Sequence, residues 1–231
     1  MKLAVSGGEA NAEDDASPRH GMRIVLLRHG ETAWNDEGRM QGWAPVPLNE
    51  TGREQATAAG RYLAAEYEFD AVYASDLERT RETTERVAAE LPATDIAYDP
   101  AFRERDIGIY QGLSYETVFA EYPRFALGDA AAEAAAATPE SGESLLDMHE
   151  RVTTGIDRVA SADHDTVLVV THGGPIHFLL GHVRGLDTRD AFLDHSMANC
   201  GVTVLDRSGA AAGTAAPVEV VRENVTAWAD G

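Results

Sequence analysis

The sequence predicts an α/β fold, a three-layer sandwich in which a mostly parallel sheet carries helices on both faces. Two short, largely apolar runs carry this prediction, MRIVLL at Met22–Leu27 and TVLVVT at Thr166–Thr171. Apolar runs without polar alternation are typical of strands that are buried on both faces. Segments of helical periodicity separate the runs, and this alternation of strand and helix indicates a parallel sheet covered by helices.

Each further element has its own local signal. A helix is predicted over Thr51–Tyr67, because Thr51 and Glu54 stand at the spacing of a capping box. Ala71–Ala74 is a second short strand, and the next helix, Asp76–Leu91, ends before a proline. The remaining predicted elements are helices over Ser144–Ala160 and Pro175–Arg184 and strands over Gly201–Asp206 and Val218–Val221.

The chain is expected to form one domain behind a tail. Residues 1–21 are small, polar and acidic, which predicts a disordered acidic tail, and residues 22–231 then form a single domain. A cap or insertion is expected at about residues 102–142. Its alanine-rich run, ALGDAAAEAAAAT at 126–138, is compatible with a helix or with a loose surface insertion. Met1 and Met22 are both candidate translation starts.

Charge and cysteine content exclude several classes of protein. The 231 residues include 39 acidic and 19 basic side chains, a formal net charge of −20, and Lys2 is the only lysine. This balance argues against general binding of nucleic acid or of an anionic membrane, since both need a basic face. It favours a protein from a salt-loving organism over an ordinary acidic cytosolic protein. One cysteine, no apolar run of roughly 20 residues and no signal-peptide core together predict a cytoplasmic location.

Basic and glycine residues follow three of the predicted strands. Arg28 and His29 follow the first strand, Arg79 lies just beyond the second, and His172 and Gly173 follow the buried strand at Thr166–Thr171. The carboxyl ends of parallel strands meet at one edge of a sheet, where ligands bind. Arginine forks and backbone N–H groups suit the oxygens of a phosphoryl group, and a neutral imidazole can attack its phosphorus. The pattern therefore predicts phosphoryl chemistry.

Four blocks, RHGETAWN, SDLERTRET, RERDIGIYQG and VTHGGPI, follow one another between Met22 and about Asp206. In this order they resemble the histidine phosphatase superfamily, in its phosphoglycerate mutase-like branch. The resemblance implies a catalytic set in which His29 becomes phosphohistidine, Glu104 is the general acid and His172 helps to hold the phosphoryl group. It implies no metal and no cofactor. The substrate-binding residues that it implies are Arg28, Asn35, Arg39, Gln41, Gly42, Arg79 and Gly173.

Several assignments have rivals in the sequence. Glu31 and Asp106 compete with Glu104 as the acid, and Ser75 is expected either to cap its helix or to help bind phosphate. Cys200 is interpreted as a buried, small apolar residue rather than a nucleophile. His177 and His182 lie five residues apart on a predicted helix, so they do not share a face and a metal pair is not expected.

Hydrolase and mutase share this machinery, and the segment after Gly112 favours the hydrolase. Mutases of the family usually carry a pair of arginines that grips the substrate carboxylate, whereas residues 114–141 contain only Arg124. The first hypothesis is therefore a metal-independent phosphomonoesterase acting on a small phosphorylated metabolite. The alternatives are a phosphoglycerate mutase and a non-catalytic phosphate-binding regulatory protein. A second copy of the chain, forming a homodimer, is an open alternative for a protein partner.

Overall fold

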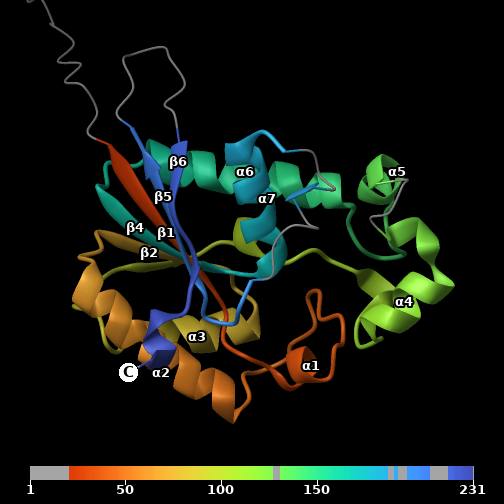
Figure 1. Cartoon of the computed structure of the whole chain (residues 1–231), viewed down its shortest axis with the longest axis horizontal. Helices are drawn as coiled ribbons and strands as arrows, with labels where there is room; N and C mark the ends of the chain where they lie inside the picture. The colour runs from red at the N-terminus through yellow and green to blue at the C-terminus, as the bar shows by residue number, and fades with distance from the viewer. Residues whose placement is uncertain (1–20, 127–130, 187–189, 192–196, 209–217, 231) are drawn as a thin grey trace, which may run out of the picture.

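The computed structural model describes residues 21–126, 131–186, 190–191, 197–208 and 218–230. Within these residues six strands form one sheet in the order β3-β2-β4-β1-β5-β6 (Figure 1). The pairs β1/β4, β2/β4 and β2/β3 are parallel, and β5 and β6 extend the sheet in antiparallel pairing. The predicted α/β fold with a mostly parallel sheet is therefore confirmed.

The strands are β1 Met22–Arg28, β2 Ala71–Ala74, β3 Ile96–Tyr98, β4 Thr166–Thr171, β5 Val202–Arg207 and β6 Val218–Val225. The α-helices are α1 Ala33–Asp36, α2 Glu50–Glu66, α3 Glu78–Ala88, α4 Tyr115–Glu121, α5 Ala131–Ala136, α6 Leu145–Ser161 and α7 Gly173–Arg184. Short 3-10 turns occur at Pro100–Phe102, Gly108–Tyr110, Pro123–Phe125 and Ala227–Asp230. Residues 1–20 of the predicted tail and residues 127–130 of the alanine-rich run lie outside the described residues. Among the helices described, none has both the length and the apolar character needed to cross a bilayer.

Two hydrophobic cores lie on opposite faces of the sheet, one under α6 and α7 and the other under α2 and α3 (Figure 1). Successive residues of a strand point to opposite faces, so each central strand must supply apolar side chains to both cores. This double burial explains why β1 and β4 are apolar without alternation. The first core receives Ile24, Leu26, Val167 and Val169, and the second receives Val25, Leu27, Leu168 and Val170.

The predicted helix starts differ from the observed ones. The first long helix, α2, begins at Glu50 because Asn49 caps it, accepting a hydrogen bond from the Gly52 N–H at 2.7 Å. The capping box expected from Thr51 is therefore not the cap. Asn49 is also held from outside the helix, since its amide donates to Glu31 Oε1 at 2.7 Å. A tertiary contact thus selects one of several neighbouring residues that could cap the helix.

The two other site-bearing helices also have shifted bounds. The predicted helix Asp76–Leu91 is shorter in the structure, where α3 begins at Glu78 after Leu77, and Leu77 makes no side-chain cap. The predicted helix Pro175–Arg184 begins two residues earlier, because His172 is the N-cap of α7 and Gly173 its first residue. The earlier start of α7 brings its first backbone N–H groups directly to the end of β4.

The cap segment packs its own small core beside the sheet. Tyr110, Val118 and Phe125 form this cluster, and Figure 1 shows α4 beside the sandwich, whereas α5 packs against α6 and supplies Ala135 to the first core. The guanidinium of Arg105 joins the two ends of the segment by donating to Ala137 O at 2.8 Å and to Glu143 O at 2.9 Å. The described part of the alanine-rich run includes the helix α5, which resolves the choice left open by its composition.

Candidate active site

A cavity of about 620 Å³ opens at the carboxyl ends of β1, β2 and β4, between the sheet and the cap. His172 lies beneath it and is fully buried, with its ring centroid 5.2 Å from that of His29. The structure therefore brings together the residues that the sequence predicted at three separate strand ends. The predicted residues that line the cavity are Arg28, His29, Asn35, Gln41, Gly42, Arg79, Glu104 and Gly173.

Two hydrogen bonds fix the ring of His29. Nδ1 lies 2.7 Å from the carbonyl oxygen of Gly30, and Nε2 lies 3.3 Å from Nε of Arg79. A carbonyl only accepts and a guanidinium only donates, so the proton belongs on Nδ1 and the lone pair on Nε2. Burial, with the positive charges of Arg79 and Arg28, holds the pKa of His29 well below 6.5. The ring is therefore neutral and has a nucleophilic nitrogen.

Two buried arginines flank this nitrogen. Arg79 is 1% exposed and donates to Gly42 O at 2.8 Å, and burial lowers its pKa to about 10. Arg28 donates to the carbonyl of Met197, and its Nε is buried without a hydrogen-bond partner among the described residues. Burial also lowers the pKa of Arg28. The two guanidinium groups create a local positive charge within a strongly acidic protein, and this suits a dianionic ligand.

The second histidine is oriented by Ser75. His172 Nε2 lies 2.9 Å from Ser75 Oγ, and Oγ accepts a hydrogen bond from the Leu77 N–H at 3.3 Å. Nδ1 of His172 is buried and has no hydrogen-bond partner within the described part of the chain. Burial, followed by the charge of Arg79, holds the pKa of His172 well below 6.5. Ser75 therefore makes no side-chain cap of α3 and instead holds a neutral imidazole in place.

Glu104 is held by backbone N–H groups on both carboxylate oxygens. Oε1 accepts from the N–H of Arg105 at 2.9 Å, and Oε2 accepts from the N–H of Gly174 at 3.1 Å, in the first turn of α7. The rival acids do not line the cavity: Glu31 accepts from Asn49, and Asp106 accepts from the Gly108 N–H at 2.9 Å. Among the three acids, geometry therefore favours Glu104.

The remaining predicted residues differ in their placement. Oδ1 of Asn35 is engaged in the cap of α1, where it accepts from the Thr32 N–H at 3.1 Å. Gln41 is 8% exposed, and its buried Oε1 has no hydrogen-bond partner among the described residues. Arg39 does not line the cavity: its guanidinium pairs with Glu37 at 2.5 Å, and its side chain is 47% exposed. Its predicted contact with substrate gains no support from this placement.

Most of the remaining cavity wall is apolar, and sequence reasoning did not identify it. Many of these side chains come from the cap, where no periodic pattern marks an inward face, whereas Leu145 and Met148 belong to the periodic apolar positions of the predicted helix Ser144–Ala160. Asn199 was also missed: its amide donates to the carbonyl of His29 at 3.1 Å and braces the nucleophile loop. The apolar lining residues are Met40, Ile107, Val118, Phe119, Phe125, Ala126, Pro139, Leu145, Met148 and Met197, and Tyr110, Tyr115 and His177 also line the cavity.

Neither a metal-binding cluster nor the cysteine adds a reactive group to the described part of the site. Within the residues that the structure describes, no group of three or more His, Cys, Asp or Glu side chains is arranged to hold a metal ion. Cys200 is fully buried, as expected for a small apolar residue, and burial raises the pKa of its thiol to about 12. A thiol of that pKa is a poor nucleophile near neutral pH.

Comparison with known proteins identifies the family. The family described as "Histidine phosphatase superfamily (branch 1)" matches residues 24–215. The chain belongs to this superfamily. It is 36% identical over 162 residues to the phosphoglycerate mutase-like protein 4 of Arabidopsis thaliana, a match that covers 70% of each protein. It is 35% identical over 175 residues to the metal-independent phosphoserine phosphatase of the same plant, covering 75% of this chain and 74% of that protein.

A solved structure of a mycobacterial member is also similar. The glucosyl-3-phosphoglycerate phosphatase in complex with VO3 matches with a TM-score of 0.72 and 30% identity, over 88% of this chain and 99% of the other. The resemblance drawn from the four sequence blocks is thus confirmed. Phosphatases are prominent among the relatives by name, which supports phosphatase chemistry for this member of the superfamily.

Proposed function

We propose that this protein is a metal-independent phosphomonoesterase that works through a phosphohistidine on His29. One observation carries the proposal: the lone pair of His29 Nε2, two buried arginines and the carboxylate of Glu104 meet at one cavity. A nucleophile, a charge clamp and an acid–base group are the three parts that phosphoryl transfer needs when no metal takes part.

In the first step Nε2 of His29 attacks phosphorus, and the bond from phosphorus to the leaving oxygen breaks. Glu104 gives its proton to that oxygen, so the product leaves as a neutral alcohol. The guanidinium groups of Arg28 and Arg79 hold the phosphoryl oxygens, whose charge they balance. His172 adds a hydrogen bond from Nδ1, because Ser75 can donate its hydroxyl proton to Nε2 while accepting from a backbone N–H.

In the second step Glu104, now a carboxylate, takes a proton from water as the water oxygen attacks phosphorus. The phosphorus–nitrogen bond breaks, Nε2 recovers its lone pair, and inorganic phosphate is released. The proton that Glu104 gained restores the acid for the next cycle. The backbone N–H of Gly173 and the amide Nδ2 of Asn35 supply further donors to the phosphoryl group, since the hydrogen bonds from Thr32 and Asn199 to the Asn35 side chain engage its Oδ1.

The leaving-group side of the cavity favours hydrolysis over mutase activity. Arg105 lines the cavity, but its guanidinium is already engaged by the carbonyls of Ala137 and Glu143. Arg124 lies over the ring of Phe125 at 4.7 Å and is not part of the lining. A phosphoglycerate mutase must hold a carboxylate, whereas this wall is mainly apolar. We therefore expect substrates whose alcohol part is apolar or aromatic to be preferred over small carboxylated ones.

The decisive experiment is a turnover assay with EDTA present, at low salt and in molar KCl. The panel includes p-nitrophenyl phosphate, 1-naphthyl phosphate, glycerol phosphate, phosphoserine and glucosyl-3-phosphoglycerate, the last two because relatives are named for them. We expect phosphate release that His29→Ala abolishes, together with a phosphoenzyme that survives an alkaline quench. His164→Ala is the matched control, because that histidine lies beside Tyr73, away from the cavity.

Three outcomes separate the hypotheses. Interconversion of 2- and 3-phosphoglycerate that depends on a bisphosphoglycerate primer, measured in a parallel assay, would establish the mutase instead. Phosphate binding without turnover of any substrate, in either salt condition, would favour the non-catalytic binding protein. Activity that persists in His29→Ala would refute the assignment of the nucleophile itself.

A further inference from the structure

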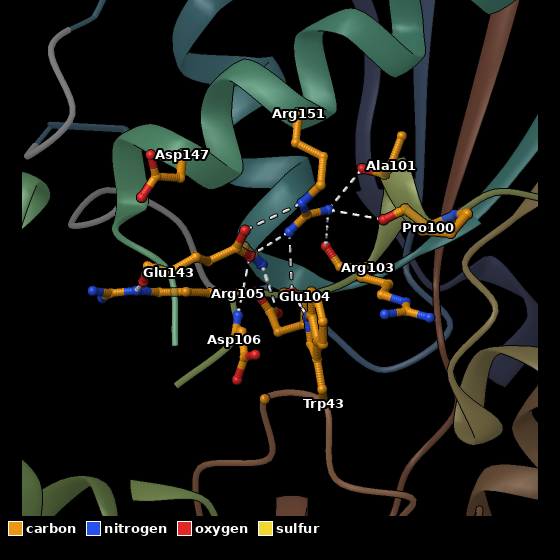
Figure 2. Close-up of polar contacts among 12 residues, drawn as sticks. Trp43, Pro100, Ala101, Arg103, Glu104, Arg105, Asp106, Glu143, Asp147 and Arg151 are labelled. Atoms are coloured by element: carbon orange, nitrogen blue, oxygen red, sulfur yellow. Dashed lines mark hydrogen bonds and ion pairs between the residues drawn. The ribbon is translucent and has the colours of Figure 1, made fainter. Parts of the chain in front are cut away.

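We propose that Arg151 is a positioning residue for the reaction, acting through the backbone that carries Glu104. This inference rests on the proposed function, because it concerns the placement of the general acid. Arg151 lies on α6 and does not line the cavity, so it does not touch the reacting atoms. Figure 2 shows its side chain extending from the helix onto the chain segment that precedes and includes Glu104.

The guanidinium of Arg151 binds four backbone carbonyl groups within the segment 100–104. Its NH1 group donates to the carbonyls of Pro100 at 3.1 Å, Ala101 at 2.9 Å and Arg103 at 3.0 Å. Its NH2 group donates to the carbonyl of Glu104 itself at 3.3 Å. One side chain therefore holds the backbone carbonyls of Glu104 and of the residues that lead to it.

Glu143 extends the clamp to the other side of Glu104. Its carboxylate pairs with NH2 of Arg151 at 2.5 Å and with Nε at 3.3 Å. The same carboxylate accepts from the backbone N–H of Asp106 at 3.0 Å (Figure 2). The side chains of the pair are only 20% and 17% exposed. The Arg151–Glu143 pair thus grips the chain before and after Glu104.

The segment needs such a clamp because it has no regular structure of its own. Residues 103–107 belong to neither a helix nor a strand, so their carbonyls lack the hydrogen-bond partners that regular secondary structure would supply. Trp43 Nε1 also donates to the Glu104 carbonyl, at 2.7 Å. With the backbone fixed from outside, the side chain of Glu104 can reach the N–H groups of Arg105 and Gly174. Backbone position therefore decides where the proton donor lies.

Arginine is the residue type that this position requires. Six hydrogen bonds leave the guanidinium, which has five N–H groups in a planar fork, so at least one group is shared. Lysine offers three donors on a single nitrogen and cannot cover acceptors spread over this width. We therefore expect Arg151→Lys to behave like Arg151→Gln rather than to rescue it.

The experiment compares two leaving groups, because only one of them needs the acid. Nitrophenolate departs without a proton, whereas an alkoxide such as that of glycerol phosphate must be protonated as it leaves. The quantity measured is kcat/KM, which reports steps up to departure of the leaving group. For Arg151→Gln we expect about a 100-fold loss with glycerol phosphate, the cost of misplacing a reacting group by about 1 Å. With p-nitrophenyl phosphate the loss should stay within about threefold, since general acid catalysis is not needed there.

Three companion variants make the result specific. Arg158→Gln is the matched control: this arginine is on the same helix, but its 55% exposed side chain pairs with the carboxylate of Asp99 at 2.5 Å and with none of the carbonyls that Arg151 binds, so both substrates should react normally. Glu143→Gln should reproduce the selective loss in milder form. Adding Arg151→Gln to a Glu104→Gln background should lower kcat/KM almost no further, because both changes disable the same acid group.

Each other outcome has a defined meaning. Equal losses with both substrates in Arg151→Gln would overturn the proposal, since they would show a general structural role. Failure of both Arg151→Gln and Glu143→Gln to fold would overturn it for the same reason. If Glu104→Gln itself fails to discriminate between the leaving groups, then the acid assignment within the proposed function is wrong, and the clamp has no acid to place.

Discussion

Replacing Gly174 by alanine should separate the two chemical steps of the reaction. A Cβ at this position would collide with Oε1 of Glu104 and would lie 3.1 Å from its Cδ and 3.2 Å from Cε of Met148. The carboxyl group must therefore move aside, and it loses its hydrogen bond from the Gly174 N–H. Gly173→Ala is the matched change, because a Cβ there lies 3.7 Å from Arg28 Nε, an ordinary contact distance.

The size of the effect follows from two independent considerations. A hydrogen bond to a charged group contributes about 1.5–3 kcal/mol, and about 1.4 kcal/mol corresponds to a tenfold change in rate. This gives a loss of roughly 10- to 150-fold. Moving the carboxyl by about 1 Å to relieve the collision gives about 100-fold by the usual cost of misplacement. Gly173→Ala adds a better helix former to the first turn of α7 and should not lower the melting temperature, whereas in Gly174→Ala the lost hydrogen bond and the crowding against Met148 should outweigh that gain and lower it.

The assay is rapid mixing with p-nitrophenyl phosphate, followed by the absorbance of nitrophenolate. Gly174→Ala should release about one nitrophenolate per active site in a burst, since phosphorylation of His29 needs no acid with this substrate. The steady rate should then fall about 100-fold, because hydrolysis of the phosphoenzyme needs Glu104 as base. Gly173→Ala should retain a steady rate at least ten times that of Gly174→Ala. Equal steady rates in the two folded variants would refute the reasoning.

Other predictions concern pH, packing and salt. Burial holds the pKa of His29 and His172 well below 6.5, so kcat/KM should stay level as pH falls through 6.5; a midpoint at 6.5 or above in the pH–rate profile would contradict this. Below pH 6.5 these two histidines are protonated in the unfolded chain but stay neutral in the folded one. The free energy of unfolding should therefore fall as the pH is lowered, and less steeply in His172→Asn. Gly155→Ala places a Cβ 2.8 Å from that of Ala101 and should lower the free energy of unfolding by about 1–3 kcal/mol in urea titrations. With a net charge of −20, activity and stability should both rise toward molar KCl, and a decline from full activity at low salt would count against halophily.

The central sheet could be predicted from the sequence because both of its faces are covered. Residues 22–27 and 166–171 are apolar for a purely local reason, namely that each successive side chain enters one of two cores. The start of α2 could not be predicted in the same way. Asn49 and Thr51 are both good N-cap residues, and the choice depends on Glu31, which lies 18 residues earlier and binds Asn49.

Some residues of the candidate site could be predicted from local sequence, and others could not. His29, Arg79 and His172 could be brought together from the sequence, because each follows a parallel strand whose end lies at the same edge. Glu104 could be assigned only through resemblance to a family, since nothing local marks it among its acidic neighbours. Arg151 was not predicted, because it acts on backbone carbonyls and these have no signature in a sequence. Its place on α6 looks like any charged position on a solvent-facing helix.

The two buried arginines tie the stability of the fold to the anions around it. Arg28 and Arg79 are removed from water, and within the described residues their hydrogen-bond partners are carbonyl groups and an imidazole rather than carboxylates. Arg28 further lowers the pKa of Arg79 by repulsion. A bound oxyanion offsets this cost only in the folded chain, so at 100 times its dissociation constant it adds about 2.7 kcal/mol. Inorganic phosphate, the proposed product, should thus raise the melting temperature at the concentrations at which it competes with substrate.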